Sequence, residues 1–283
     1  MSQRDTNMGG PVIGFIGAGN MARSLAGGLV RNGWDRSRIL LSDPLPEQRA
    51  GAQQALGLKT YADNAEVAAR ADILVLAVKP QVLAEVAAAL APAVQRRKPL
   101  IVSIAAGVHI EDIERWLGGD LPIVRVMPNT AALIGSGASG LFANARVSEP
   151  QRDAAESILR AVGVTVWLED EYLLDVVTAL SGSGPAYFFL VMEALEQAAI
   201  ESGLAPAQAR LLTLETAFGA AKMALEGSEE PRELRRRVTS PGGTTEQAIE
   251  TLEQGGLRRL FKEAFAAAVR RAGELADLFG KNR

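Results

Sequence analysis

The chain has 283 residues, a formal net charge of −3 and a hydrophobic fraction of 48%, which suggests about two domains with sizeable cores. It contains no cysteine and only one histidine, which excludes disulfides and thiolate sites and argues against a multi-histidine metal centre or a Ser-His triad. The charge balance does not favour nucleic acid or an anionic membrane as a partner, and we predict no metal site.

The N-terminal residues 1–10 are polar and lack the apolar stretch of a signal peptide, so we expect a loose arm there. No run of 18 apolar residues is free of charged interruptions, so we expect no transmembrane span. The absence of cysteine is compatible with a reducing cytoplasm. Basic clusters at 235–237 and 258–259 lie among helix formers, and we interpret them as solvated helix faces.

The first candidate site is a glycine turn between a predicted strand and a predicted helix. An apolar run ending at Ile16 is typical of a buried strand, and the following residues match G-x-G-x-x-A. Gly17 permits the tight turn, Gly19 lets a pyrophosphate approach the backbone, and Ala22 lets the helix pack close to the strand. The free amides of the new helix would face the phosphates. We predict a dinucleotide site formed here by Gly17, Ala18, Gly19, Asn20 and Met21.

An acidic residue ends the second predicted strand, at about the spacing expected of a residue that binds the adenosine ribose. This residue, Asp43, would also disfavour a 2′-phosphate. Ser42, Gln48 or Arg49 could offset that effect by binding the phosphate, so the sequence leaves NADP(H) and NAD(H) both open. The alternative is that Asp43 only begins an Asp-Pro turn.

The ends of the next strands extend the predicted cofactor site, because ligands of open α/β sheets bind beyond the carboxyl ends of the strands. Lys79 follows the apolar strand at 72–78, although a solvated loop lysine would look the same. Asn64 could reach the same crevice, or it could cap a helix. The small residues after the strand at 100–104 would let the nicotinamide lie against the backbone. The predicted cofactor residues added here are Asn64, Val78, Lys79, Pro80, Ala105 and Ala106.

Strands and helices alternate up to residue 169, and nearly everything after it is predicted to be helical. We therefore predict an α/β protein, with an N-terminal Rossmann-type doubly wound sheet (1–169) followed by an all-α domain (170–283). The predicted helix at 207–226 is apolar on most sides and must be covered, so we expect a second subunit to cover it. His109 is isolated, and we expect it to be structural or exposed.

A second candidate site is the Pro-Gly-Gly turn that opens a helix near residue 245. Consecutive free amides at a positive helix end make an anion site suited to a carboxylate, and two threonines add hydroxyl groups. The alternative is ordinary N-capping by a threonine. The predicted substrate residues are Ser240, Gly242, Gly243, Thr244 and Thr245.

Taken together, six blocks of this sequence resemble the pyrroline-5-carboxylate reductase family. They occur in the family's order and cover almost the whole chain beyond the N-terminal arm. Only the first block is generic, and the combination is specific. The blocks are GFIGAGNMA (14–22), AVKP (77–80), SIAAG (103–107), RVMPNT (125–130), SGSGPAY (181–187) and SPGGTTEQAI (240–249).

The resemblance implies a cytoplasmic enzyme that reduces L-1-pyrroline-5-carboxylate to L-proline with NADPH or NADH, the last step of proline biosynthesis. It also implies a helical C-terminal domain that interleaves into a homodimer, often within a larger homo-oligomer. The threonine that matches the family signature is Thr245, which would hydrogen-bond the substrate ring nitrogen while the preceding glycine amides hold the carboxylate. With no cysteine or spare histidine for acid catalysis, Thr245 is a more credible orienting group than a strong acid.

Two other functions are compatible with a dinucleotide fold. A β-hydroxyacid dehydrogenase would place a catalytic lysine on the helix after a glycine-rich stretch, but residues 186–195 contain none, and Lys222 lies on a later predicted helix. A non-catalytic NAD(P)-binding sensor is the second alternative, although no DNA-binding segment is apparent.

Overall fold

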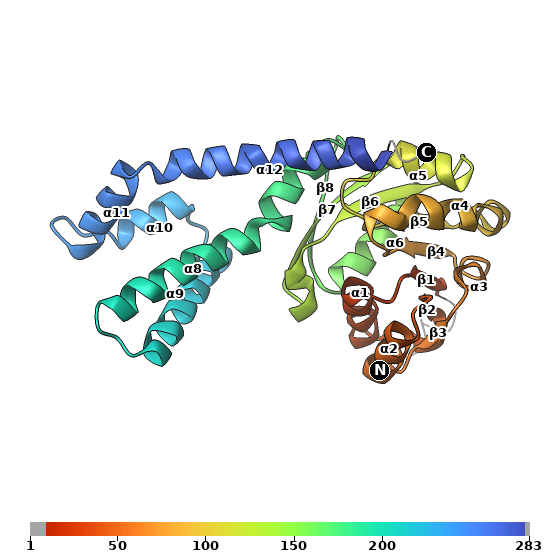
Figure 1. The fold of residues 1–283 in the computed structure, drawn as a ribbon, viewed down its shortest axis with the longest axis horizontal. Coiled ribbons are helices and arrows are strands. Elements are labelled where there is room, and N and C mark those ends of the chain that lie inside the picture. Colours follow the sequence, from red (N-terminus) through yellow and green to blue (C-terminus); the bar gives the residue numbers. More distant parts are fainter. Residues whose placement is uncertain (1–9, 281–283) are drawn as a thin grey trace. The chain divides into compact units, whose positions relative to one another are not determined.

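A single sheet dominates the N-terminal part of the chain. The computed structural model describes residues 10–280, so the predicted arm at 1–10 falls almost entirely outside the described range. Within that range, eight strands pair in the order β3-β2-β1-β4-β5-β6-β7-β8 (Figure 1), and all pairs are parallel except β6 with β7. The strands are β1 (Ile13–Ile16), β2 (Ile39–Ser42), β3 (Lys59–Tyr61), β4 (Ile73–Leu76), β5 (Leu100–Ser103), β6 (Ile123–Met127), β7 (Gly137–Ala143) and β8 (Gly163–Trp167).

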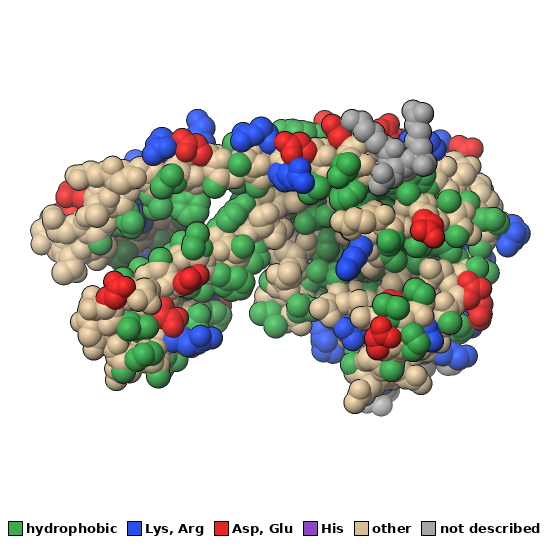
Figure 2. Space-filling model, viewed as in Figure 1, with side chains coloured by type: hydrophobic (Ala, Val, Ile, Leu, Met, Phe, Trp, Pro, Cys, Tyr) green, Lys and Arg blue, Asp and Glu red, His purple; other side chains and the backbone are tan. Residues whose placement is uncertain are grey.

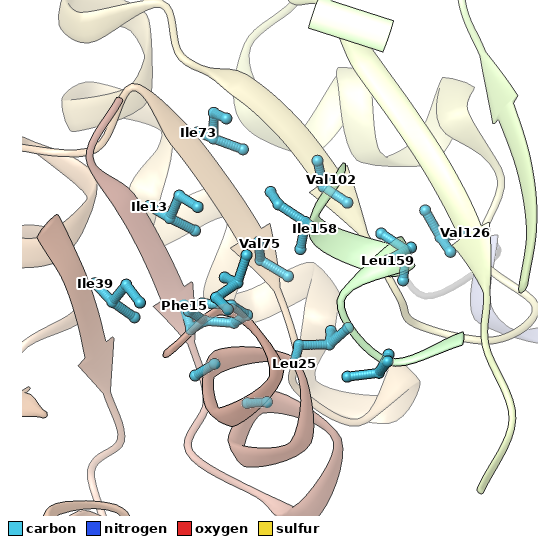
Figure 3. Packing of buried hydrophobic residues seen from close by; sticks show 14 of the residues in the cluster. Ile13, Phe15, Leu25, Ile39, Ile73, Val75, Val102, Val126, Ile158 and Leu159 are labelled. Carbon is cyan, nitrogen blue, oxygen red and sulfur yellow. The ribbon is translucent and has the colours of Figure 1, made fainter. Parts of the chain in front are cut away.

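The central strands are apolar along their whole length because helices cover both faces of the sheet. One face packs on α1 and α6, where Phe15, Leu25 and Ile158 lie in one buried cluster (Figure 3). The other face packs on α3, α4 and α5, and on the C-terminal end of α12 through Phe279. The predicted doubly wound α/β sheet is therefore confirmed. Its helices are α1 (Asn20–Arg31), α2 (Pro46–Leu56), α3 (Asn64–Ala68), α4 (Pro80–Arg97), α5 (Ile110–Leu117), α6 (Glu149–Arg160) and α7 (Leu173–Val177).

Three local features depart from the sequence prediction. The short strand β3 was not expected, and it pairs with β2 at the sheet edge. Strand β7 runs antiparallel to β6, after a short 3-10 turn (Thr130–Ile134). A π-helical stretch (Thr178–Gly182, η3) continues α7 into the SGSGPAY block, and the sequence did not predict it.

The described residues divide into two compact units. The sheet unit comprises residues 10–183 with 268–280, and the helical unit comprises residues 184–267. The last helix, α12 (Leu257–Gly280), begins in the helical unit and ends in the sheet unit. These units follow spatial contacts alone, so the functional division predicted at 169/170 stays a prediction.

Four further helices belong wholly to the helical unit, where α8 packs against α9. These four helices form almost no hydrophobic core among themselves, since only Gly184 and Ala209 are buried among their residues. One described stretch, Leu173–Glu201, is long and apolar enough to cross a membrane by length and composition, which is weak support for a span. The helices are α8 (Gly184–Glu201), α9 (Pro206–Glu226), α10 (Pro231–Arg237) and α11 (Thr244–Gln254).

Candidate functional site

The glycine turn after β1 has the backbone geometry that a phosphate site needs. Gly17 has a φ of +101°, and a Cβ atom there would lie 2.7 Å from the Ala77 carbonyl oxygen, so only glycine fits. Gly19, the N-cap of α1, has no atom within 4 Å of a Cβ position and no side-chain cap. The first amides of α1 therefore face open space at the positive end of a twelve-residue helix.

Asp43 lies at the end of β2 and binds the same turn. Its Oδ2 accepts a hydrogen bond from the Ala18 N–H at 2.9 Å, and its Oδ1 accepts one from the Leu45 N–H at 3.0 Å. The Arg49 guanidinium donates to the Asp43 carbonyl at 2.8 Å. Asp43 therefore holds the glycine turn against β2 in addition to turning the chain.

The other predicted residues at this end of the sheet differ in their accessibility. Ser42 is fully buried and its hydroxyl donates to the Phe15 carbonyl at 3.2 Å, so its side chain is not open to a ligand. Asn64 is the first residue of α3, and Asp63 takes the capping role by accepting from the Ala65 N–H. In the described part of the chain, the Asn64 Oδ1 and Gln48 Oε1 atoms are buried without a hydrogen-bond partner.

A cavity of about 230 Å³ opens at the carboxyl ends of β1, β4, β5 and β6. It gathers several residues that the sequence predicted to bind the cofactor, and it adds others that the prediction missed. Met127 and Pro128 belong to the RVMPNT block, so the signal for them was present in the sequence but was not assigned to the site. The lining residues are Met21, Ala77, Val78, Lys79, Ile104, Ala106, Met127 and Pro128.

The predicted cofactor residues Lys79, Pro80 and Ala105 differ in whether they line this cavity, and only Lys79 does so. Lys79 is exposed at the N-cap of α4, and Pro80 occupies the first turn of that helix. Ala105 is buried behind Ala106 and does not line the cavity itself. Larger cavities, of about 520 and 430 Å³, lie around Arg235 and Arg258 in the helical unit, and they contain none of the predicted site residues.

His109 belongs to a half-buried ion cluster in the sheet unit. Arg125, 3% exposed, lies 3.0 Å from the Glu171 carboxylate and 3.7 Å from that of Asp175. The His109 Nδ1 lies 3.4 Å from Glu171, and this hydrogen bond raises the pKa of His109 above its ordinary value. Burial works against the charge on Glu171, but hydrogen bonds from His109 and the Ile110 N–H, with Arg125 beside it, still lower its pKa. The cluster fits the structural role expected of His109.

The second candidate site lies in the helical unit, at the start of α11. Gly242 has a φ of +70°, and the turn closes with the Gly243 N–H donating to the Ser240 carbonyl at 3.0 Å. The Gly242 N–H donates to the Glu246 carboxylate at 2.6 Å. Both glycine amides are thus used within the turn, which differs from the expectation that they hold a substrate carboxylate. A carboxylate in the first helical turn is attracted to the positive helix end.

The amides that remain open at this end are those of the first turn of α11. Gly243 is the N-cap and provides no side-chain cap. Thr245 is half-buried and Thr244 is exposed, and neither hydroxyl makes a hydrogen bond among the described residues. Ser240 is exposed. The site therefore presents helix amides and two uncommitted hydroxyl groups, which can bind an anion and an adjacent polar atom.

Comparison with known proteins gives these two sites a common context. Residues 171–275 match the family described as pyrroline-5-carboxylate reductase dimerisation, and residues 12–107 match the family described as NADP oxidoreductase coenzyme F420-dependent. The pyrroline-5-carboxylate reductase of Pseudomonas aeruginosa is 52% identical over 97% of this chain and 100% of its own length. The chain belongs to the pyrroline-5-carboxylate reductase family.

Solved structures of pyrroline-5-carboxylate reductases have the same fold. One from Coxiella burnetii is 48% identical and superposes with a TM-score of 0.90, covering 94% of this chain and 98% of its own. One from Plasmodium falciparum, solved with NADP bound, is 28% identical with a TM-score of 0.84 and covers 95% and 100% of the two chains. The predicted family, oxidoreductase class and reaction are confirmed by these comparisons. The role of each predicted site residue stays a prediction.

Proposed function

We propose that this chain reduces L-1-pyrroline-5-carboxylate to L-proline with NADPH or NADH, and that the two described sites hold the cofactor and the substrate. Membership of the reductase family supports the reaction. Two features carry the residue assignment. The glycine turn at Gly17 is open and adjoins a cavity, and Thr245 has an uncommitted hydroxyl at the open N-terminal end of α11.

The glycine turn has the features that a dinucleotide requires. The first amides of α1 would hold the pyrophosphate, and the small side chain of Ala106 would let the nicotinamide lie in the cavity beside Met21. The buried acceptors of Gln48 and Asn64 fit hydroxyl donors of an adenosine ribose. When bound, the nicotinamide supplies the hydride, and the protein positions the acceptor carbon.

At the second site, the first-turn amides of α11 would hold the substrate carboxylate. The Glu246 carboxylate, which accepts a hydrogen bond from the Gly242 N–H at this end of the helix, would have to move away when the substrate binds, because two carboxylates at one anion site repel each other. The Thr245 hydroxyl would then accept or donate at the ring nitrogen and fix the face presented for reduction. No acid stronger than a hydroxyl is needed if the substrate binds as the iminium, because the proton then comes from solvent.

The relative with NADP bound favours NADPH, and the structure of this chain offers a physical reason why Asp43 need not oppose it. Each oxygen of its carboxylate accepts one backbone hydrogen bond, from the Ala18 and Leu45 amides, so its charge is partly compensated. Arg49 is next to it and is already oriented by backbone carbonyls. A 2′-phosphate could bind Arg49 without displacing Asp43.

The helical unit would form the homodimer contact. Its apolar side chains stay exposed in the single chain, including Phe188, Leu212 and Phe218 at 56–68%. Figure 2 shows hydrophobic side chains on the surface of this unit among polar and charged ones. A second copy that covers them gains about 25 cal/mol for each Å² buried. The reaction, which takes place on small soluble molecules, fits the predicted cytoplasmic location.

Oxidation of NADPH and NADH, followed by loss of absorbance in the presence of L-1-pyrroline-5-carboxylate, tests the reaction. We expect fast oxidation, with NADPH preferred. If neither cofactor is oxidised faster with the substrate than without it, the proposed reaction is wrong, and a panel of hydroxyacids would be tested next. A strong preference for NADH would instead return Asp43 to the role of a ribose ligand that excludes the 2′-phosphate.

A further inference from the structure

One side chain links the end of β6 to the segment after α7. Asn129 follows Met127 and Pro128, and its Nδ2 donates a hydrogen bond to the Ser181 carbonyl at 3.1 Å. Its Oδ1 accepts a hydrogen bond from the Ala138 N–H at 3.1 Å. A single half-buried amide therefore ties β6, the start of β7 and the stretch at 178–182 together, all within the sheet unit.

The stretch that Asn129 holds is the π-helical segment η3. Its wide turn is closed by the Ser183 N–H donating to the Thr178 carbonyl at 2.8 Å. Single π-helical turns inside α-helices are uncommon and are frequent at functional sites. An α-helical turn holds about one residue fewer than a π-helical turn, and the Ser181–Asn129 hydrogen bond is a contact from outside the helix that holds the wide turn.

The π-helical segment also supports one wall of the cofactor cavity. A Cβ atom on Gly182 would lie 2.6 Å from the Met127 Cε, so the Met127 side chain packs directly on the Gly182 backbone. Met127 lines the 230 Å³ cavity together with Met21 and Ala106. A shift of Gly182 would therefore move the Met127 wall, while the glycine turn at Gly17 would stay in place.

We propose that Asn129 is a positioning residue for hydride transfer, which holds the π-helical segment so that Gly182 fixes Met127 as a wall of the cavity. This inference rests on the proposed function of the cavity. Loss of the amide would free the Ser181 carbonyl, let η3 relax toward an α-helical path and move Met127. Because the phosphate-binding turn is untouched, cofactor affinity would be retained while the reacting atoms lose their alignment.

Asn129→Ala can be compared with a control at the other end of the antiparallel β6–β7 pair, where Asn144 directly follows β7. Asn144 also bridges backbone groups with its amide, since it accepts from the Ile123 N–H and donates to the Leu121 carbonyl. Asn129→Ala loses two hydrogen bonds, and Asn144→Ala loses three, because the Asn144 Oδ1 also accepts from the Arg146 N–H. We therefore expect Asn144→Ala to lose at least as much thermal stability as Asn129→Ala. Only Asn129→Ala should lower kcat, by about 10- to 100-fold, with the NADPH dissociation constant within about two-fold of wild type. Its primary kinetic isotope effect with 4-deuterated NADPH should rise.

A second variant moves Met127 without removing any hydrogen bond. Gly182→Ala places a methyl group against the end of the flexible Met127 side chain, and alanine in a helix is favourable to stability. We expect a stable protein with lower kcat and unchanged NADPH affinity. Provided that the wild type is active, either of two results would refute the positioning role. One is an equal kcat for Asn129→Ala and Asn144→Ala, and the other is a wild-type kcat for Gly182→Ala. An inactive wild type would instead refute the proposed function itself.

Discussion

The two units of the chain differ in how much of their apolar surface is buried. In the sheet unit, the central apolar strands are covered on both faces, and side chains as large as Phe15 and Leu25 have no exposure. In the helical unit, Phe218 is 63% exposed, and Ala209 is the one hydrophobic residue buried among the described residues 184–267. The core of the sheet unit forms within one chain, although Val164 and Val166 of β8 stay exposed, whereas we expect another copy of the chain to cover the helical unit.

The largest effect should come from breaking the glycine turn of the sheet unit. Gly17→Ala combines left-handed backbone strain with a clash at the Ala77 carbonyl, so we expect a loss of about 3 kcal/mol in the free energy of unfolding and no measurable NADPH binding. The matched control is Gly33→Ala, where φ is +86° and the Cβ position is open. It should lose about 1 kcal/mol in urea titrations and bind NADPH normally. Equal losses in the free energy of unfolding of the two variants would show that the clash with the Ala77 carbonyl contributes nothing.

The next effect concerns the substrate site of the helical unit. Thr245→Ala removes one uncommitted hydroxyl, and we expect kcat to fall on the order of 100-fold while NADPH affinity stays near that of the wild type. Thr251→Ala is the control, because Thr251 lies on the same helix and its hydroxyl is already used, donating to the Gln247 carbonyl at 2.9 Å. Steady-state kinetics with both cofactors give the answer. Wild-type turnover in Thr245→Ala would remove Thr245 from the site.

A charge on the exposed face of α9 should weaken assembly by a comparable amount. Leu212→Asp buries an unpaired carboxylate in the proposed contact, which costs about 3 kcal/mol, so the dimer should dissociate about 100-fold more readily. Leu278→Asp changes a leucine of similar exposure in the sheet unit and should leave assembly unchanged. Concentration-dependent sedimentation compares them. A greater effect of Leu278→Asp would show that the dimer contact lies on the sheet unit and would contradict this prediction.

The smallest effect is a pH dependence within the sheet unit. The folded pKa of His109 is raised above its ordinary value of 6.5 by its hydrogen bond with Glu171. Its ion pair therefore contributes stability that is fully present below pH 6.5 and is lost as the pH rises through the folded pKa. Relative to His109→Ala, the wild type should gain under about 1 kcal/mol at acidic pH and less at alkaline pH. A gap in urea unfolding that widens with rising pH would contradict this sign.

Much of the sheet unit was predictable because its signals are local. Buried parallel strands are continuous apolar runs, and the glycine turn follows from backbone sterics at Gly17. The strand β3 was missed because it has three residues, and the antiparallel direction of β7 follows from pairing across the sheet. The π-helical segment was not predicted either, and the Ser181 carbonyl within it accepts a hydrogen bond from Asn129, a residue distant in the sequence.

For the turn that we propose as the substrate site, the sequence predicted the location but not the hydrogen bonds. The Pro-Gly-Gly turn and the start of α11 lie where the sequence indicated. The use of the glycine amides was not foreseeable from residue types, because Glu246 reaches back to Gly242 only once the turn has formed. The periodicity of α12 likewise gives no sign that its last residues, including Phe279, pack under the sheet.

The most direct test of the account is the mass of the active particle in solution. Analytical ultracentrifugation of the wild type, with activity measured across the same concentrations, shows whether the helical unit is completed by a second copy. We predict a species of at least twice the chain mass of 29.9 kDa, with activity lost in step with dissociation. A fully active monomer of 29.9 kDa would contradict the account.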